Sequence, residues 1–428
     1  MIRCVTRTLG EICDDVGGII RTGPFGTQLH QSDYSEEGTP VVMPQNIADG
    51  KVSVEDIARI RNEDVNRLLN HRLQVGDIVY GRRGDIGRRA LITKKEEGWL
   101  CGTGSLRISL GKTVIDPKFL YYYLGQLHVI NLIYNNAIGA TLPNLNTSII
   151  RRIPITYPPL PTQRKTAAIL SAYDDLIENN LQRITILEEM AKNLYRDWFV
   201  NFCFPGYETV KMMDSELGMI PEGWNYESIL KSPFFDLIED NVKPYVGKMK
   251  YFATADVNRI ELEGKGIEYY FKDKPSRAQK QPVLYSVWFA RMQDTYKVLA
   301  FTPINNELAL HSMLSSGFVG FKTRFEQSFP FLYCTIGSEE FHKLKDLYCT
   351  GATQRSLTNE GMRHIEVVVP TNDVVLEFGR CVQPMLDQLL ILQQKNIILR
   401  QCRDLLLPKL ISGQIDVSDL DIKVEEDA

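Results

Sequence analysis

Two stretches of this 428-residue chain repeat apolar side chains every seven residues. The first runs from Thr162 to Trp198 without proline or glycine, and one heptad position holds Leu170, Ile177, Ile184, Ala191 and Trp198. The second runs from Val374 to Leu407, and the same position holds Phe378, Met385, Leu392, Leu399 and Leu406. This period predicts two long helices that pack on each other as a coiled coil, although ordinary bundle packing would show the same pattern.

Polar residues interrupt the second apolar position of both heptad stretches. Asn180 stands there in the first stretch and Asn396 in the second. A buried asparagine costs stability but fixes the register of paired helices, so we expect this role for both residues. Pro384 lies inside the second stretch and should kink that helix or delay its start.

The sequence before each heptad stretch has a different texture, with short alternating runs broken by turns. Asp77–Tyr80 and Ser105–Leu110 predict strands, and Arg83-Gly84-Asp85 predicts a turn between strands. Helical segments interrupt this texture, and we predict one of them over Lys118–Asn135. The chain should therefore contain mixed strand and helix units, each followed by a long helix.

The chain also repeats itself at a constant offset of 212 in residue number. Gly139-Ala140-Thr141 aligns with Gly351-Ala352-Thr353, and Phe119-Leu120-Tyr121 aligns with Phe331-Leu332-Tyr333. Further matches at the same offset continue to Pro158 and Pro370. A colinear set of this kind indicates a duplication, with two copies of one unit of about 210 residues.

Composition and charge place the protein among ordinary globular chains. Charged residues make up 24% and the net charge is −4, which by itself argues mildly against nucleic-acid binding. The eight cysteines form no C-x-x-C pair, so we expect reduced thiols and no zinc site. Neither a signal peptide nor a run of roughly 18 apolar residues is found, so we expect a cytoplasmic protein that does not enter a membrane.

The distribution of charge reverses the argument from net charge. The segment from Arg59 to Lys95 has ten basic and four acidic residues, a net +6, and Lys243 to Lys297 has eleven and six, a net +5. The last segment, Asp416 to Ala428, has six acids and one lysine, a net −5. Each copy of the repeat thus carries a basic stretch, which favours nucleic-acid binding over a merely solvated face.

Motifs of catalysis are absent from the sequence. The single Pro-Pro pair, Pro158-Pro159, lacks the preceding Asn or Asp of an adenine methyltransferase, and no P-loop or G-x-G-x-x-G loop is found. The lone G-x-G at Gly102–Gly104 is interpreted as a turn. A nuclease or transferase built on sparse carboxylates stays open, as does a protein–protein scaffold organised by the coiled coil.

The residues from Pro161-Thr162-Gln163 through Asp174-Asp175-Leu176-Ile177-Glu178-Asn179-Asn180 strongly resemble the central conserved region of the specificity (S) subunits of type I restriction–modification systems. Gly218–Trp224 resembles the opening of that family's second half, and Leu405–Gly413 resembles its closing segment. The chain departs from the family pattern before its second helix, where Thr371-Asn372-Asp373 replaces the Pro-Leu-Pro-x-Gln run.

The resemblance implies an α+β fold with two target-recognition domains, joined by two long helices that form an antiparallel coiled coil with an internal pseudo-two-fold repeat. The implied boundaries are 1–158 and 204–370 for the recognition domains, 159–203 and 371–412 for the helices, and 413–428 for an acidic tail. Each domain would read half of a split target in double-stranded DNA. Since the copies differ in sequence, the target should be asymmetric.

The resemblance also implies that the chain is a non-catalytic subunit. It would dock two modification subunits on its helices and join restriction subunits in the complex. It would hold no cofactor itself, because S-adenosylmethionine, ATP and Mg²⁺ would be bound by those partners.

Candidate DNA contacts are polar residues in the loops near the basic stretches, because Arg, Gln and Asn read base edges and Lys and Arg bind phosphates. In the first copy they are Arg21, Gln28, Gln45, Asn46, Arg82, Arg83, Arg88, Ser105, Thr141 and Asn144. In the second copy they are Lys248, Arg277, Gln279, Arg291, Ser316, Lys322, Gln354 and Arg355. The Gly-Ala-Thr matches could equally be a turn that the fold requires, and the arginines could contact phosphates alone.

Overall fold

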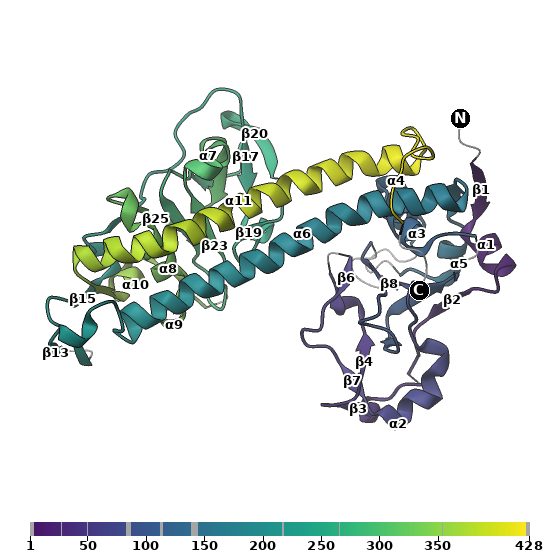
Figure 1. The fold of residues 1–428 in the computed structure, drawn as a ribbon, viewed down its shortest axis with the longest axis horizontal. Coiled ribbons are helices and arrows are strands. Elements are labelled where there is room, and N and C mark those ends of the chain that lie inside the picture. The colour runs from purple at the N-terminus through teal and green to yellow at the C-terminus, as the bar shows by residue number, and fades with distance from the viewer. Residues whose placement is uncertain are drawn as a thin grey trace. The chain divides into compact units, whose positions relative to one another are not determined.

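The computed structural model describes residues 4–26, 28–48, 50–82, 87–111, 114–137, 144–215, 218–264, 266–352 and 354–424. The chain divides into two compact units (Figure 1). The first unit holds residues 1–176 and 399–428, and the second unit holds residues 177–398. Two long helices, α6 (Leu160–Tyr195) and α11 (Asn372–Ile411), each contribute residues to both units.

The first unit contains two four-stranded sheets. One has the order β2-β11-β8-β9 and is antiparallel throughout, with strands Ile19–Thr22, Ser105–Ser109, Ile78–Gly81 and Arg89–Leu91. The other has the order β10-β4-β7-β3, with strands Leu100–Cys101, Thr39–Val42, Arg59–Ile60 and Tyr34–Ser35. The strands predicted over Asp77–Tyr80 and Ser105–Leu110 are confirmed to within one residue.

Short elements complete the first unit. Strand pairs are formed by β1 (Val5–Thr8) with β12 (Pro154–Tyr157), and by β5 (Ile47–Ala48) with β6 (Lys51–Val52). The helices are α1 (Leu9–Asp15), α2 (Asn62–Val65), α3 (Pro117–Tyr123), α4 (Leu127–Asn136) and α5 (Thr147–Arg151). The helical stretch predicted over Lys118–Asn135 is confirmed, but it consists of two helices, α3 and α4, because Gln126 has an extended backbone, with φ −69° and ψ 140°, and begins a new helix.

The second unit repeats this plan. One sheet has the order β16-β25-β22-β23, with strands Phe235–Leu237, Phe318–Thr323, Ser286–Ala290 and Val298–Phe301. The other has the order β20-β17-β24-β21, with strands Ile267–Tyr270, Lys248–Phe252, Ser312–Ser315 and Ala278–Lys280. In each unit the second sheet contains one parallel pair, β10 with β4 and β24 with β17.

The remaining elements of the second unit match those of the first at the offset found in the sequence. Helices α8 (Phe329–Gly337), α9 (Glu339–Leu347) and α10 (Asn359–Arg363) begin at the offset of 212 from the starts of α3, α4 and α5, and β28 (Glu366–Val369) follows β12 at the same offset. The unit also contains β13 (Met212–Ser215), β14 (Gly218–Pro221), β15 (Asn225–Ser228), β18 (Val257–Asn258), β19 (Glu261–Leu262), α7 (Asn306–Leu310), β26 (Cys349–Thr350) and β27 (Ser356–Leu357). The duplication read from the sequence is therefore a repeat of topology.

The heptad residues of α6 and α11 lie between these helices, which run antiparallel. Within the second unit, the Asn180 side chain donates to the Asn396 side chain (2.8 Å), and the rings of Trp198 and Phe378 lie 5.6 Å apart. Residue numbers thus rise along α6 as they fall along α11. Asn180 is 8% exposed and Asn396 is fully buried, so the buried pair expected from the heptads is present.

Pro384 does not delay the start of the second helix. Helix α11 begins at Asn372, well before the proline, and continues through it. Val375 and Phe378 in its first turns are fully buried in the core of the second unit. Burial of those side chains offsets the roughly 3 kcal/mol that an internal proline costs, and Pro384 itself is exposed, so the carbonyl that it leaves unpaired can meet water.

Candidate nucleic-acid interface

Arg82 directly follows β8 and lies among the predicted contacts of the first unit. Its N–H donates to the Gly104 carbonyl (2.8 Å), and its carbonyl accepts from the Leu145 N–H (2.9 Å). Its side chain is only 9% exposed, with Nε donating to the Leu145 carbonyl (2.8 Å) and Nη2 to Asn144 Oδ1 (3.5 Å). The guanidinium also lies 5.8 Å from the ring centre of Phe25. Arg82 therefore links three segments of chain from within the fold.

Arg291 directly follows β22 and occupies the equivalent place in the second unit. Its N–H donates to the Gly317 carbonyl (2.9 Å), and its carbonyl accepts from the Leu357 N–H (2.8 Å). Leu357 matches Leu145 at the offset of 212, and Gly317, like Gly104, comes just before an inner strand of its sheet. We call this set of backbone bonds the arginine frame, and each unit has one.

The second arginine frame also gathers other predicted contacts. The Ser316 N–H donates to the Arg277 carbonyl (2.8 Å), and the Gln293 N–H donates to the Arg355 carbonyl (3.1 Å). Arg277 and Arg355 are exposed, whereas Ser316 and Arg291 are half-buried. Residues far apart in the sequence thus meet at one end of the sheet through main-chain bonds.

Exposure separates the predicted contacts into three groups. Ten are exposed: Arg21, Gln28, Gln45, Arg88, Lys248, Arg277, Gln279, Lys322, Gln354 and Arg355. Three are half-buried: Asn144, Arg291 and Ser316. The third group, discussed next, is buried, and Arg83 and Thr141 lie outside the described residues.

Three predicted contacts are buried, and the structure corrects them. Asn46 accepts from the Met43 N–H (3.1 Å) and is 1% exposed, so it closes a turn inside the fold. Ser105 is fully buried and donates to the Val42 carbonyl (3.0 Å). Like Arg82, these two residues use side-chain polar atoms in hydrogen bonds to the protein's own backbone.

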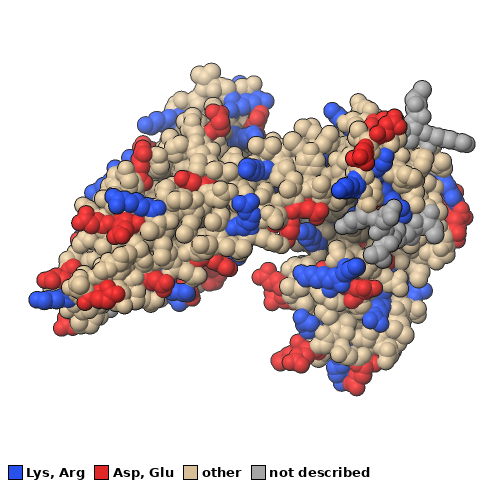
Figure 2. All heavy atoms as spheres, in the orientation of Figure 1, with Lys and Arg blue, Asp and Glu red and all other residues tan. Residues whose placement is uncertain are grey.

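Charge on the face shown in Figure 2 is mixed, with lysine and arginine interspersed among aspartate and glutamate. Many exposed cations have acidic neighbours, as in the ion pairs Arg67–Asp33 (2.8 Å) and Arg324–Asp236 (3.0 Å). Arg291 differs, because burial lowers the pKa of its guanidinium and it forms no ion pair with a carboxylate of the described residues. Burial, and then Arg291, also lower the pKa of the nearby Lys280 ammonium.

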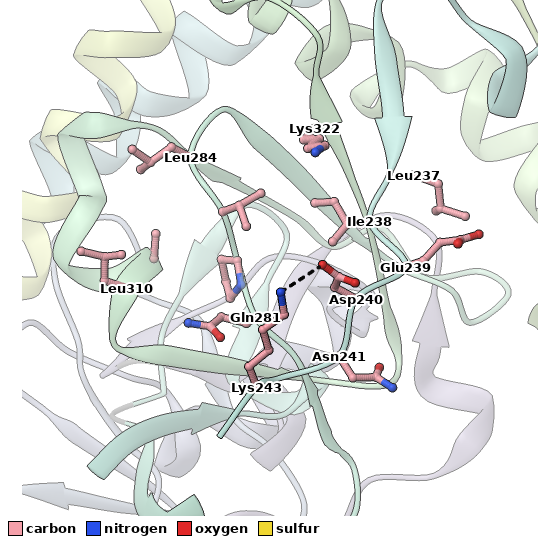
Figure 3. A pocket seen from close by; sticks show the side chains of 13 residues that line it. Leu237, Ile238, Glu239, Asp240, Asn241, Lys243, Gln281, Leu284, Leu310 and Lys322 are labelled. Carbon is pink, nitrogen blue, oxygen red and sulfur yellow. Dashed lines mark ion pairs between the residues drawn. The ribbon is translucent and has the colours of Figure 1, made fainter. Parts of the chain in front are cut away.

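A hollow of about 550 Å³ in the second unit lies beside β16 and the chain at 281–284 (Figure 3). Glu239, Asp240, Lys243 and Lys322 line it together with leucines 237, 284 and 310. The ammonium of Lys243 lies 3.8 Å from a carboxylate oxygen of Asp240. Acids and bases of this lining offset each other, so the hollow has no single-sign charge for a DNA phosphate.

Polar side chains link α3 of the first unit to both long helices, and the sequence did not predict this link. The Tyr122 hydroxyl of α3 donates to Asp174 of α6 (2.5 Å), which pairs with Arg403 of α11 (2.5 Å). Burial, and then the Asp174 carboxylate, raise the pKa of Tyr122. The positions equivalent by the offset of 212 hold Cys334, Leu386 and Ala191, which are all buried, so these three positions of the second unit carry no charge.

Gln163 is a second residue whose role the sequence did not show. Its fully buried side chain accepts from the Asp116 N–H (2.9 Å) and donates to the carbonyls of Val114 (3.2 Å) and Pro158 (2.8 Å). Asp116 in turn caps α3 by accepting from the Phe119 N–H (2.9 Å). The equivalent position of the second unit holds the buried Val375, whose apolar side chain can form none of these hydrogen bonds.

The described residues contain neither a metal centre nor a membrane-spanning helix. No group of three or more His, Cys, Asp or Glu side chains in the described ranges could hold a metal ion. Among these same residues, no helix has both the length and the apolar character that spanning a membrane requires.

Comparisons with known proteins agree with this architecture. Residues 6–189 match the family model described as the type I restriction modification DNA specificity domain. The MjaIX type I restriction enzyme specificity subunit of Methanocaldococcus jannaschii is 26% identical over 81% of this chain and 79% of its own length. The putative MjaX specificity subunit of the same organism is 22% identical over 94% of this chain and 92% of its own length.

A solved structure shares the fold over nearly the whole chain. The crystal structure of the type I restriction–modification S subunit from M. genitalium covers 96% of both chains, with a TM-score of 0.54 and 15% identity. Two strand-rich units with equivalent arginine frames and two shared helices make the architecture of this chain a duplicated one. The chain is thus similar to specificity subunits of type I restriction–modification systems, by the family model over residues 6–189 and by these relatives over most of its length.

Proposed function

We propose that this chain reads a bipartite, asymmetric target in double-stranded DNA, with one half-site for each unit. The proposal rests on the arginine frames of the two units, which have the same backbone hydrogen bonds but carry different side chains. The frames share an arginine, but Asn144 of the first corresponds to Ser356 of the second at the offset of 212. Because an amide and a hydroxyl pair with different base edges, equal scaffolds with unequal side chains favour two different half-sites. The similarity to specificity subunits disfavours a scaffold or an undetected nuclease.

The long helices are proposed as the docking site of two modification subunits. Ile391 and Ile398 lie one heptad apart on α11, and both are exposed, Ile398 by 57%. On α6, Ile186 and Met190 lie one helical turn apart and are 55% and 47% exposed. Large apolar side chains on the outside of a two-helix pair are available for burial by a partner. Restriction subunits would join the same assembly.

S-adenosylmethionine, ATP and Mg²⁺ are assigned to the partner subunits, and this chain is proposed to hold none of them. The cytoplasm is the proposed compartment, since a protein that reads cellular DNA must have access to it.

Reconstitution with purified subunits tests the proposal. The chain alone, with DNA, Mg²⁺ and S-adenosylmethionine, should transfer no methyl group and cut no DNA, and adding modification subunits should start methyl transfer. Ile398→Asp should weaken assembly by at least tenfold, because it places a charge in an apolar contact, as measured by light scattering of the mixed subunits. Ile267→Asp is the matched control, since Ile267 is 62% exposed on β20 and should leave assembly unchanged. Methyl transfer by the chain alone would overturn the proposal.

A further inference from the structure

The side chains of the two frame arginines, Arg82 and Arg291, have different surroundings. The Arg82 Nε donates to the Leu145 carbonyl (2.8 Å), so this guanidinium serves the chain that leads into α5. The Arg291 Nε is buried and has no hydrogen-bond partner among the described residues. The backbone bonds of the two frames match, at 2.8 and 2.9 Å for Arg82 and at 2.9 and 2.8 Å for Arg291, so the difference lies in the side chains alone.

The surroundings of Arg291 are those of a site for an anion. Arg277 and Arg355 lie on segments bonded to the same frame, and both are exposed. The Arg355 guanidinium donates to the Cys349 carbonyl (3.1 Å). The Lys280 ammonium donates to the Glu239 carbonyl (3.3 Å), and the carboxylates of Asp240 and Glu239 only partly oppose the lowering of its pKa by burial and by Arg291. A half-buried guanidinium without a carboxylate is costly in the free protein, and a ligand oxygen would remove that cost.

We propose that Arg291 binds a paired acceptor on DNA, whereas Arg82 is a positioning residue that holds the chain at Asn144–Leu145. The inference rests on the proposed function and adds a division of labour between equivalent residues. An arginine fork can meet its acceptors on a phosphate or on the O6 and N7 atoms of guanine, and the two sources share one geometry. The half-site read by the second unit therefore depends on Arg291 directly. The half-site read by the first unit depends on Arg82 only indirectly, through the loop at Asn144–Leu145 that Arg82 holds in place.

The test uses the full chain assembled with its modification subunits and a duplex that carries the mapped target. Arg291→Gln should weaken binding about ten- to a hundredfold, because it removes a charge-assisted contact. If the acceptor is a phosphate, the slope of log affinity against log salt should fall by about one. If it is guanine, discrimination should be lost at one base pair of one half-site. The unfolding midpoint of Arg291→Gln should equal or exceed that of the wild type, because an uncompensated charge is removed.

Arg82→Gln should show the opposite profile. Its unfolding midpoint should fall by about 2–4 °C, because a buried internal hydrogen bond is lost, while its salt slope stays that of the wild type. Arg363→Gln is the matched control, since Arg363 is exposed and paired with Glu360 (3.3 Å). The inference is overturned if Arg291→Gln binds with wild-type affinity, slope and discrimination, or if it loses as much thermal stability as Arg82→Gln. A wild-type complex that shows no preference for the target would instead overturn the proposed function.

Discussion

Replacing Gln163 with leucine should lower the free energy of unfolding by about 3 kcal/mol, the largest single effect that we expect from a polar side chain of this protein. The substitution keeps a similar volume but leaves the Asp116 N–H and the carbonyls of Val114 and Pro158 without their partner. Buried backbone groups that lose a hydrogen bond cost about 1–3 kcal/mol each, less whatever water restores. Urea unfolding followed by circular dichroism measures the change.

Gln182→Leu provides the control for this measurement. Gln182 is exposed on the same helix, and its side chain donates only to Glu178 (3.3 Å), so its replacement should change stability by less than about 0.5 kcal/mol. A Gln163→Leu protein as stable as Gln182→Leu would contradict the role assigned to Gln163 in joining α6 to α3.

The paired asparagines should show strong coupling. Asn180→Leu leaves the fully buried Asn396 amide without its partner, and Asn396→Leu does the same to Asn180, so each should cost about 1–3 kcal/mol. The double variant should recover most of that loss, because two leucines can pack at the seam without an unsatisfied group. Asn396 Nδ2 already has no partner among the described residues, which favours recovery in the double variant.

A double-mutant cycle measures this coupling. If the two single losses simply add in the double variant, the asparagines do not act as a pair. Their expected role in fixing register stays a hypothesis that the cycle addresses only in part. Register itself would be read from disulfide trapping of engineered cysteine pairs along α6 and α11.

The sequence predicted the structure best where a pattern repeated over many residues. Seven-residue spacing over Leu170, Ile177 and Ile184 identified the buried face of α6, because only a regular helix keeps such residues aligned. The constant offset of 212 likewise anticipated the repeated topology. Both patterns can be recognised without knowing which loops contact each other in the folded protein.

Contacts between loops could not be predicted in the same way. Asn46 and Ser105 have the composition of base readers, yet their partners are backbone groups brought near by the fold. Gln163 stood in a motif that pointed to the family, but its three bonds reach segments that only folding brings together. The equivalence of Arg82 and Arg291 was hidden for a related reason, since the offset of 212 leads from Arg82 to Asp294 instead.

Single-molecule methylome sequencing of the host, with and without this gene, tests the central claim most directly. The account predicts one bipartite motif with two different half-sites and a fixed gap, modified only when the gene is present. A palindromic motif that depends on the gene would contradict the reading of different half-sites by the two units. A methylome that does not change when the gene is removed would contradict the proposal that this chain directs modification.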